Sequence, residues 1–266
     1  MVKVLINGIN GKMGRAITQS AYRNPEIKII GGIGPVGRSY IGTDVGVLTG
    51  LGNAIEAVVY DDIAQIIEEC DIVIDCTRAD ITLNLLGFCL EYKKSLITGT
   101  TGFSDKEKKQ IEEAGQHIPV LLAANTSRVA HVFFEIVRLL TKKLGQDADI
   151  DIIEMHENKK PDAPSGTAKE IASIISDQLG LKLDDIAEYG RKGKGIRPSQ
   201  SICFNSIRSG GFPSSHKIIF GFLNEKIELQ LDGYNMNSYA DGIIEGTMFL
   251  SNKKAGLYTI NQVFGE

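Results

Sequence analysis

The sequence predicts an α/β protein: an N-terminal Rossmann-like domain with a doubly wound parallel sheet, and a C-terminal α+β domain with an open mixed sheet. Three observations support this prediction. Short apolar runs alternate with helical segments as far as Asn125, glycines follow the first run at a spacing of three, and three strand-like runs separated by short turns begin at residue 201. Strands that alternate with helices are typical of parallel sheets, whereas strands joined by short turns are typical of antiparallel or mixed sheets.

In the first domain, each expected strand is a short apolar run, and the expected helices carry apolar or small residues on one face. The expected strands cover residues 2–6, 27–32, 58–60, 71–75, 95–98 and 120–123. The expected helices cover residues 14–23, 63–70, 81–91 and 104–116, and Asp62 precedes the second of them as an N-cap.

In the second domain, the first expected strand has a polar, alternating face. The expected strands cover residues 149–155, 201–208, 216–222 and 226–231, and the expected helices cover residues 131–143, 169–179 and 240–251. We assign residues 1–126 and 237–266 to a dinucleotide-binding domain, and residues 127–236 to a substrate-binding domain.

Size and composition exclude several classes of protein. A chain of 266 residues can bury two cores, and 42% hydrophobic with 23% charged residues is ordinary for a globular protein. The net charge of −4, without a long basic run, argues against nucleic acid as a partner. No apolar run approaches the roughly 18 residues of a membrane span, and the N-terminus reads as a core strand, not a signal peptide. We therefore expect a cytoplasmic protein with a small-molecule substrate.

The four cysteines, Cys70, Cys76, Cys89 and Cys203, lie in apolar contexts without Cys-x-x-Cys spacing. This favours reduced core thiols over disulfides or metal ligands. We predict no bound metal.

The glycine-rich turn after the first strand predicts a dinucleotide site. Gly8, Gly11 and Gly14 allow a sharp turn, a close approach of backbone to pyrophosphate, and close helix–strand packing. The free N–H groups at the helix start favour a phosphate. The GxxGxxG spacing alone is also compatible with a merely tight turn. The residues expected to contact the cofactor are Gly8, Gly11, Lys12, Met13, Gly14, Arg15, Arg38, Thr77, Gly99, Thr100, Thr101, Ala124 and Asn125.

The end of the second strand bears on the choice between NADH and NADPH. An acidic residue there would bind the adenosine ribose, but residues 32–38 contain no carboxylate. Lys12, Arg15 and Arg38 are placed to face a 2′-phosphate, unless Arg38 is simply solvated. We predict NADPH as the cofactor, with NADH as the alternative.

Two further loops follow the fourth and fifth expected strands, at residues 75–78 and 99–103. Ligands bind at the carboxyl ends of strands in open α/β sheets. Gly99 lets the backbone approach the nicotinamide, and Thr100 and Thr101 can hold its amide or a substrate carboxylate. An ordinary connecting loop is the alternative.

The segment 154–168 carries the expected catalytic groups. A strand delivers His156, Lys160 follows in a loop, and Ser165 or a neighbour caps the next helix. The Ser165, Gly166 and Thr167 run at a helix start suits an anion, because backbone N–H groups and hydroxyls converge there. We predict that His156 and Lys160 act in proton transfer and that this run, with Lys160, binds a substrate carboxylate.

These motifs together resemble the 4-hydroxy-tetrahydrodipicolinate reductase (dihydrodipicolinate reductase) family, almost from end to end. The segments that carry the resemblance are residues 8–15, 75–77, 99–103, 123–127, His156 with Lys160, 162–167, 208–211 and His216. The resemblance implies NAD(P)H-dependent reduction of 4-hydroxy-tetrahydrodipicolinate in lysine and diaminopimelate biosynthesis. It also implies that His156 is the general acid/base, that Lys160 is the second proton donor or substrate clamp, and that a homotetramer assembles through the C-terminal sheets.

Departures from the family pattern leave alternatives open. Glu157 stands where the family has a second histidine, and the segments 128–131 and 231–236 differ as well. We include Glu157 and Thr101 among the substrate-binding positions. Either Glu157 turns outward and Arg128, Lys159 or His131 replaces it, or the substrate is a different cyclic imine or unsaturated carboxylate. A non-catalytic dinucleotide sensor would need only the Rossmann half.

Overall fold

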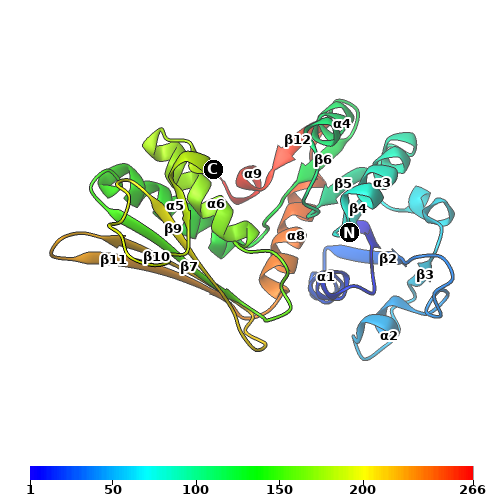
Figure 1. The fold of residues 1–266 in the computed structure, drawn as a ribbon. Helices are drawn as coiled ribbons and strands as arrows, with labels where there is room; N and C mark the ends of the chain where they lie inside the picture. The colour runs from blue at the N-terminus through cyan, green and yellow to red at the C-terminus, as the bar shows by residue number, and fades with distance from the viewer. Residues whose placement is uncertain (266) are drawn as a thin grey trace. The chain divides into compact units, whose positions relative to one another are not determined.

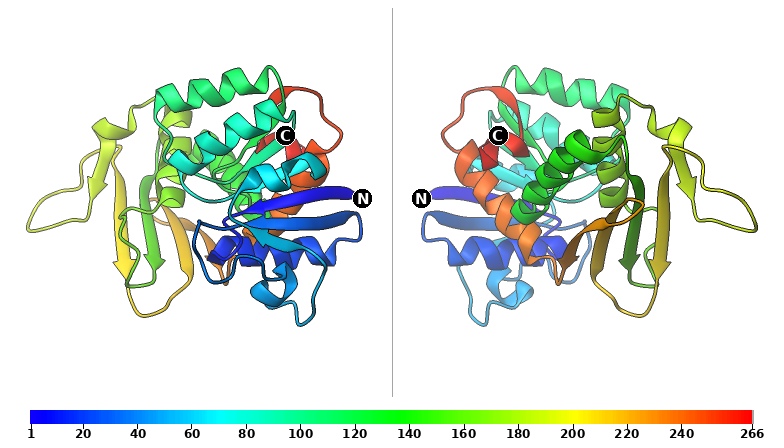
Figure 2. Two further views of the ribbon diagram at one scale, coloured as in Figure 1. Left: turned by 90° about the vertical axis from the view of Figure 1, so that its right-hand side faces the viewer. Right: turned by 90° about the vertical axis from the view of Figure 1, so that its left-hand side faces the viewer.

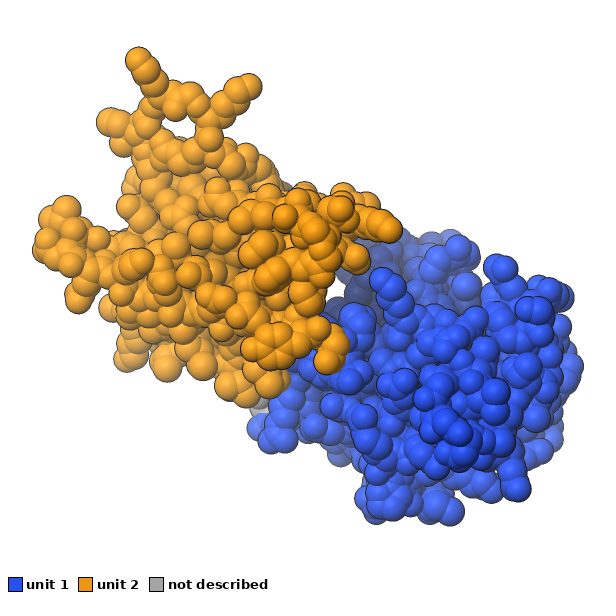
Figure 3. Space-filling model, turned by 90° about the horizontal axis from the view of Figure 1, so that it is seen from below, with its two compact units in different colours: residues 1–128, 236–266 blue, residues 129–235 orange. Residues whose placement is uncertain are grey.

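The protein is described by a computed structural model, which covers residues 1–265. It contains two compact units, shown in different colours in Figure 3: Met1–Arg128 with Met236–Glu266, and Val129–Asn235. These boundaries differ from the predicted domain divisions by one or two residues. The functions that we assign to the two domains stay predictions.

The first unit contains a seven-stranded parallel sheet in the order β12-β6-β5-β4-β1-β2-β3. The chain returns to the middle of the sheet between β1 and β4, which makes a topological switch point there. The predicted doubly wound parallel sheet is confirmed. Its strands are β1 (Val2–Asn7), β2 (Ile27–Ile33), β3 (Val58–Tyr60), β4 (Ile72–Asp75), β5 (Ser95–Thr98), β6 (Pro119–Leu122) and β12 (Gly256–Thr259).

Helices cover both faces of this sheet (Figure 2), and each face has its own apolar core. Ile17 on α1 and Ile243 on α8 pack in one core, whereas Leu85 on α3 and Ile111 on α4 pack in the other. The helices of this unit are α1 (Lys12–Arg23), α2 (Val45–Thr49), α3 (Ala79–Glu91), α4 (Asp105–Gly115), α8 (Asn237–Leu250) and α9 (Ile260–Phe264).

The single helix expected over residues 63–70 is wrong. The chain forms two 3₁₀ turns, η1 (Ile63–Gln65) and η2 (Ile67–Glu69), which are separated where Ile66 leaves helical geometry at φ −139°. Both Ile66 and Ile67 are buried, and the break lets these adjacent side chains reach the core. The sequence also did not predict α2, α9 or β12.

The second unit contains a five-stranded mixed sheet in the order β11-β10-β7-β9-β8. β7 pairs antiparallel with β10 and parallel with β9, so the predicted mixed sheet is confirmed. Its strands are β7 (Asp149–His156), β8 (Ala187–Tyr189), β9 (Ile202–Arg208), β10 (Ser214–Gly221) and β11 (Lys226–Gly233). The short β8 and the helix α7 (Leu183–Ile186) were not predicted.

Two helices, α5 (Arg128–Leu144) and α6 (Gly166–Leu179), lie on one face of this sheet (Figure 1). Phe133 and Ile171 from the helices pack against Ile152 and Ile218 from the strands. On β7, the buried positions Ile150, Ile152 and Glu154 alternate with partly exposed ones, so Glu154 points towards the helices. A charged residue on the core side of a strand needs a polar partner.

All four cysteines are free thiols, as expected. Among residues 1–265, no helix combines the length and the apolar character that a membrane crossing requires.

Candidate active site

The glycine turn joins β1 to α1 at the switch point of the first sheet. Gly8 has a φ of +72°, and a Cβ there would lie 2.7 Å from the Cγ2 atom of Thr77, in the loop after β4. A Cβ at Gly14 would collide with the carbonyl oxygen of Gly8. Gly11 is the N-cap of α1 and provides no side-chain cap. The turn therefore presents the amino end of a 12-residue helix beside the loop after β4, as a pyrophosphate site requires.

The buried carboxylate of Asp75, at the end of β4, ties the neighbouring loops together. It is 0% exposed. It accepts hydrogen bonds from Asn7 Nδ2 (2.7 Å), Thr77 Oγ1 (2.7 Å), Thr82 Oγ1 (2.5 Å), Thr98 Oγ1 (3.2 Å) and Thr100 Oγ1 (3.1 Å). The Thr100 hydroxyl oxygen also accepts from the backbone N–H of Thr77 at 3.1 Å. These bonds hold the loops after β4 and β5 side by side.

The two loops form a pocket of about 190 Å³ within the first unit. Its lining includes six of the residues predicted to contact the cofactor: Met13, Thr77, Gly99, Thr100, Thr101 and Ala124. Asn125 is buried next to the pocket lining and its side chain accepts from the backbone N–H of Ser127 at 3.1 Å. Cys76 also lines the pocket, where burial raises the pKa of its thiol to about 12, so it stays protonated.

The basic residues predicted at the cofactor site differ in their surroundings. The guanidinium of Arg15 donates to the carbonyl oxygen of Leu48 at 2.6 Å and to Asn10 Oδ1 at 2.5 Å. Arg15 therefore holds the glycine turn against α2. Arg38 is exposed in the loop after β2, and Lys12 is exposed at the start of α1.

The first unit has a second pocket, of about 220 Å³, that the sequence did not predict. Asn7, Asp61 and Asp62 line it, together with apolar residues of α3. Asp61 and Asp62 directly follow the third strand, and ligands bind at the carboxyl ends of such strands. Their position could therefore have indicated this pocket.

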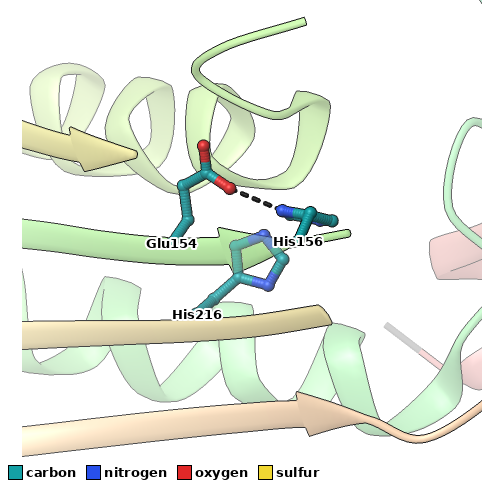
Figure 4. Close-up of side chains that lie close together, drawn as sticks. All are labelled: Glu154, His156 and His216. Atoms are coloured by element: carbon teal, nitrogen blue, oxygen red, sulfur yellow. Dashed lines mark hydrogen bonds and ion pairs between the residues drawn. The ribbon is translucent and has the colours of Figure 1, made fainter. Parts of the chain in front are cut away.

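In the second unit, the end of β7 carries a hydrogen-bonded pair of side chains. Nδ1 of His156 lies 2.5 Å from Oε2 of Glu154, which is 0% exposed (Figure 4). The guanidinium of Arg208, at the end of β9, donates to both carboxylate oxygens, at 2.9 and 2.8 Å. In the register of the sheet, Glu154 is opposite His216 on β10, and His156 is opposite Arg208.

The charges in this group shift its pKa values. Burial opposes the ionisation of Glu154, but hydrogen bonds from Arg208, Ser206 and His156 outweigh it and lower the pKa of the carboxyl. Burial lowers the pKa of His156, and Glu154 partly offsets this effect. Burial, with the neighbouring His156, lowers the pKa of His216 to about 4. Near neutral pH the group therefore contains an anion, a guanidinium and two mainly neutral imidazoles.

The predicted anion site lies at the start of α6. Ser165 is the N-cap, as expected, and its hydroxyl oxygen accepts from the backbone N–H of Ala168 at 3.2 Å. The same hydroxyl lies 3.0 Å from Nε2 of His216. The hydroxyl can accept a second hydrogen bond or donate its proton, so the tautomer of His216 sets the direction of this bond. This bond fixes the orientation of Ser165 next to Gly166 and Thr167.

Lys160 and Glu157 lie in the loop between β7 and α6. Nζ of Lys160 is 2.8 Å from Oδ1 of Asp162, and its positive charge contributes to lowering the pKa of His156. Glu157 follows β7 directly and is partly exposed. The second unit thus brings His156, Lys160 and Ser165 into one region.

The sequence reasoning assigned no role to Glu154, Arg208 or His216. The available signal was a glutamate at an inward-facing position, two residues before His156 on the same strand. The ligand atoms of Glu154, His156 and His216 lie within 4.8 Å of one another. However, Arg208 already neutralises the carboxylate, so this cluster is organised as an ion pair with hydrogen bonds and not as a metal centre.

Both units match family models. Residues 2–126 match the one described as "Dihydrodipicolinate reductase, N-terminus", and residues 129–264 match the one described as "Dihydrodipicolinate reductase, C-terminus".

Two curated relatives are named 4-hydroxy-tetrahydrodipicolinate reductase. The protein from Hahella chejuensis (strain KCTC 2396) is 35% identical over 266 residues, which cover 100% of this chain and 99% of the relative. The protein from Colwellia psychrerythraea (strain 34H / ATCC BAA-681) is 37% identical over 265 residues, which cover 99% of this chain and 98% of the relative.

Solved structures share the fold. The dipicolinate-bound dihydrodipicolinate reductase from Paenisporosarcina sp. TG-14 has a TM-score of 0.76 at 22% identity, and the match covers 97% of each chain. The amine dehydrogenase from Mycobacterium smegmatis has a TM-score of 0.68 at 12% identity, and the match covers 98% of this chain and 95% of that one.

Proposed function

Because the chain belongs to the dihydrodipicolinate reductase family, we propose that it uses a nicotinamide dinucleotide to reduce 4-hydroxy-tetrahydrodipicolinate to tetrahydrodipicolinate, in lysine and diaminopimelate biosynthesis. The observation that carries this proposal is the cluster of His156, Lys160 and the Ser165-capped helix start in the second unit. This cluster combines a proton donor, a cation and an anion site, which a dinucleotide sensor would not need.

The residues of the first unit fit a dinucleotide. A side chain at Gly8 or Gly14 would collide with neighbouring atoms, and Gly11 offers no side chain to cap α1. The N–H groups at the start of α1 therefore stay available to a pyrophosphate. Thr100 and Thr101 in the neighbouring pocket would hold the nicotinamide amide. When bound, the reduced cofactor supplies the hydride.

We propose NADPH as the preferred form, with NADH as a second substrate. No carboxylate lies at the end of β2 to bind an unmodified ribose, and Arg38 is exposed in the following loop. Arg15 would contribute by holding the glycine turn in place, since its guanidinium binds Leu48 and Asn10.

The second unit supplies the proton and the anion contacts. The helix start at Ser165, Gly166 and Thr167, together with Lys160, binds a substrate carboxylate through N–H groups, hydroxyls and a positive charge. Thr101 would assist at the cofactor–substrate junction. The imidazole of His156 takes up a proton from water at Nε2 and donates it to the substrate, while a conjugated C=C–C=N system accepts hydride.

One observation favours a second candidate, a reductase of the same family with a different cyclic imine or unsaturated carboxylate as substrate. Glu157 adds a carboxylate where the family pattern has a histidine, and two neighbouring carboxylates repel each other. An ionised Glu157 facing the pocket would therefore weaken binding of a dicarboxylate.

We also propose a cytoplasmic homotetramer built through the sheets of the second unit. The sheet face opposite α5 and α6 carries partly exposed apolar side chains, among them Ile153, Met155, Ile207 and Ile219. Sedimentation of the purified protein tests this assembly.

The activity is tested by mixing the purified protein with freshly formed 4-hydroxy-tetrahydrodipicolinate and NADPH or NADH, and by following oxidation of the cofactor. Turnover with NADPH and production of tetrahydrodipicolinate are expected. Oxidation only with another cyclic imine would favour the second candidate.

A further inference from the structure

We infer that Glu154, held by Arg208, is a positioning residue that keeps the proton of neutral His156 on Nδ1 and so reserves Nε2 for proton exchange with substrate. This inference rests on the proposed function, which makes His156 the acid/base. It assigns to the reaction two residues that do not touch substrate themselves. Figure 4 shows the Glu154–His156 pair on which it depends.

The contact between the two side chains determines which nitrogen of His156 carries the proton. Nδ1 lies 2.5 Å from Oε2 of Glu154. An ionised carboxylate only accepts hydrogen bonds, so Nδ1 must be the donor. A neutral imidazole has one N–H, and therefore Nε2 is left with its lone pair. A carboxylate that orients a catalytic imidazole in this way is a recurring arrangement in enzymes.

Arg208 keeps Glu154 ionised although the glutamate side chain is fully buried. Its terminal nitrogens donate to both oxygens of Glu154, at 2.9 and 2.8 Å, and Glu154 is 0% exposed. A paired, bidentate arginine is what a buried carboxylate needs to remain charged.

Arg208 also connects the acid/base to the anion site. One of its nitrogens donates to the carbonyl oxygen of Asp162 at 2.5 Å, in the loop that leads to Ser165. The same guanidinium therefore determines where the His156 ring and this loop lie. The rigid fork of arginine can span both partners, whereas lysine offers a single point charge.

Several charged or titratable groups surround His156. They come from β7 (Glu154), β9 (Arg208), β10 (His216) and the loop after β7 (Lys160), and Asp232 on β11 acts on His216. Burial lowers the pKa of His156, Glu154 raises it, and Lys160 and Arg208 lower it. Glu154 is therefore the group that opposes the loss of the His156 proton, and removing its charge makes the imidazole less basic.

The first experiment needs no variant. Heteronuclear NMR of protein labelled at the histidine nitrogens distinguishes the two neutral tautomers. We expect the Nδ1–H form for His156 in the full-length protein. The Nε2–H form would overturn the inference, whether or not the protein reduces the proposed substrate.

The second experiment uses Glu154→Gln, which keeps the shape and removes the charge. We expect kcat to fall by at least roughly 10-fold, since replacing the carboxylate partner of a histidine costs about 10- to 100-fold at metal sites and more in catalytic triads. The alkaline limb of kcat/KM, which reports the loss of the His156 proton in the free enzyme, should move to lower pH by about one unit, because the opposite charge that favours imidazolium is gone. The KM for the cofactor should not change.

Asp151→Asn is the matched control, because Asp151 lies on the same strand and is paired with Arg197 at 2.6 Å. It should leave the pH profile unchanged. Arg208→Lys provides a second variant should Glu154→Gln not fold, and it should also lower kcat and move the alkaline limb. The inference would be overturned if the folded variants kept the kcat of the wild type and the alkaline limb of their kcat/KM profile did not move. A wild-type protein inactive on the substrate would instead refute the proposed function.

Discussion

Each unit buries one carboxylate completely beside its candidate site, and the two are held in different ways. Asp75, at the end of β4, is satisfied by an asparagine amide and four threonine hydroxyls. Glu154, near the end of β7, is satisfied by the guanidinium of Arg208 and the imidazole of His156. Both side chains are 0% exposed, so burial does not distinguish them.

The difference lies in whether a partner can change its protonation near neutral pH. Amides and threonine hydroxyls do not titrate there, so Asp75 can only hold loops in place. Imidazole does titrate there, so the charge of Glu154 is coupled to a proton that moves. We therefore expect Asp75 to determine the shape of the cofactor pocket and Glu154 to determine the chemistry of its neighbour.

The largest effect is expected in the second unit. His156→Ala and Lys160→Ala should each lower turnover by roughly 100-fold or more, the usual contribution of a positioned acid or base. Cofactor affinity, measured by calorimetry, should be nearly unchanged, since neither residue belongs to the first unit. His117→Ala, which removes an exposed histidine, is the control. Near-normal turnover in either variant would show that the role assigned to that residue is wrong.

Asp75→Ala should act on the first unit through structure. It leaves several buried donors without an acceptor, and we expect a loss of about 3 kcal/mol of unfolding free energy in denaturant titrations. The KM for the cofactor should rise, while the pH dependence of turnover of the folded protein stays as in the wild type. Asp80→Ala, which removes an exposed carboxylate paired with Arg78, controls for loss of charge. A moved pH profile for Asp75→Ala would contradict the contrast between the two carboxylates.

His216 should make the stability of the protein depend on pH. Its pKa is about 4 in the folded protein, against 6.5 for an ordinary histidine, so the unfolded chain binds more protons between these values. Stability should therefore fall as pH drops through this window, by about 2 kcal/mol from pH 7 to pH 5. His216→Gln should flatten this part of the curve in denaturant titrations at both pH values. An equal slope in the variant would assign the effect to other groups.

Arg38→Ala should weaken NADPH about tenfold, or ~1.4 kcal/mol, and leave NADH nearly unchanged. Arg15→Ala should weaken both cofactors alike, because Arg15 supports the glycine turn through Leu48. Calorimetry with both cofactors separates the two cases. A wild-type preference for NADH by tenfold would contradict the proposed cofactor choice.

The smallest effect is expected at Glu157. Glu157→His should tighten inhibition by pyridine-2,6-dicarboxylate by roughly threefold, or ~0.7 kcal/mol, because a repulsive carboxylate is replaced by a donor. Inhibition constants measured for wild type and variant provide the test. No inhibition of either protein at millimolar inhibitor would favour the substrate that lacks a second carboxylate.

Local sequence patterns predicted the parts of the molecule that depend on neighbouring residues. The parallel sheet, the glycine turn and the cap at Ser165 each follow from residues a few positions apart. Contacts between distant strands could not be predicted in the same way. Glu154 and Arg208 are 54 residues apart and meet through the register of the second sheet, whereas Ser165 and His216 are 51 apart and meet where α6 begins beside β10.

Short elements were the other failure. β12 has four residues, and the turns that replace the expected helix at 63–70 have three each. β3 and β5 are equally short but were recognised as apolar runs, whereas β12 (Gly-Leu-Tyr-Thr) is an edge strand without a buried residue, so packing determines its conformation. The contact of Arg15 could not be predicted either, because its partner Leu48 lies on α2, a helix that the sequence did not predict.

The first unit is built from two segments that are far apart in the sequence, and this affects how it folds during synthesis. α8 contributes Ala240, Ile243 and Ile244 to the core that Val4 and Ile6 begin, and β12 completes the sheet beside β6. A ribosome makes β1 early and these segments late, whereas all residues of the second unit are made in between. Until α8 has emerged, this face of the nascent sheet is covered only in part, by α1, and the apolar surface that stays exposed makes the nascent chain prone to aggregation.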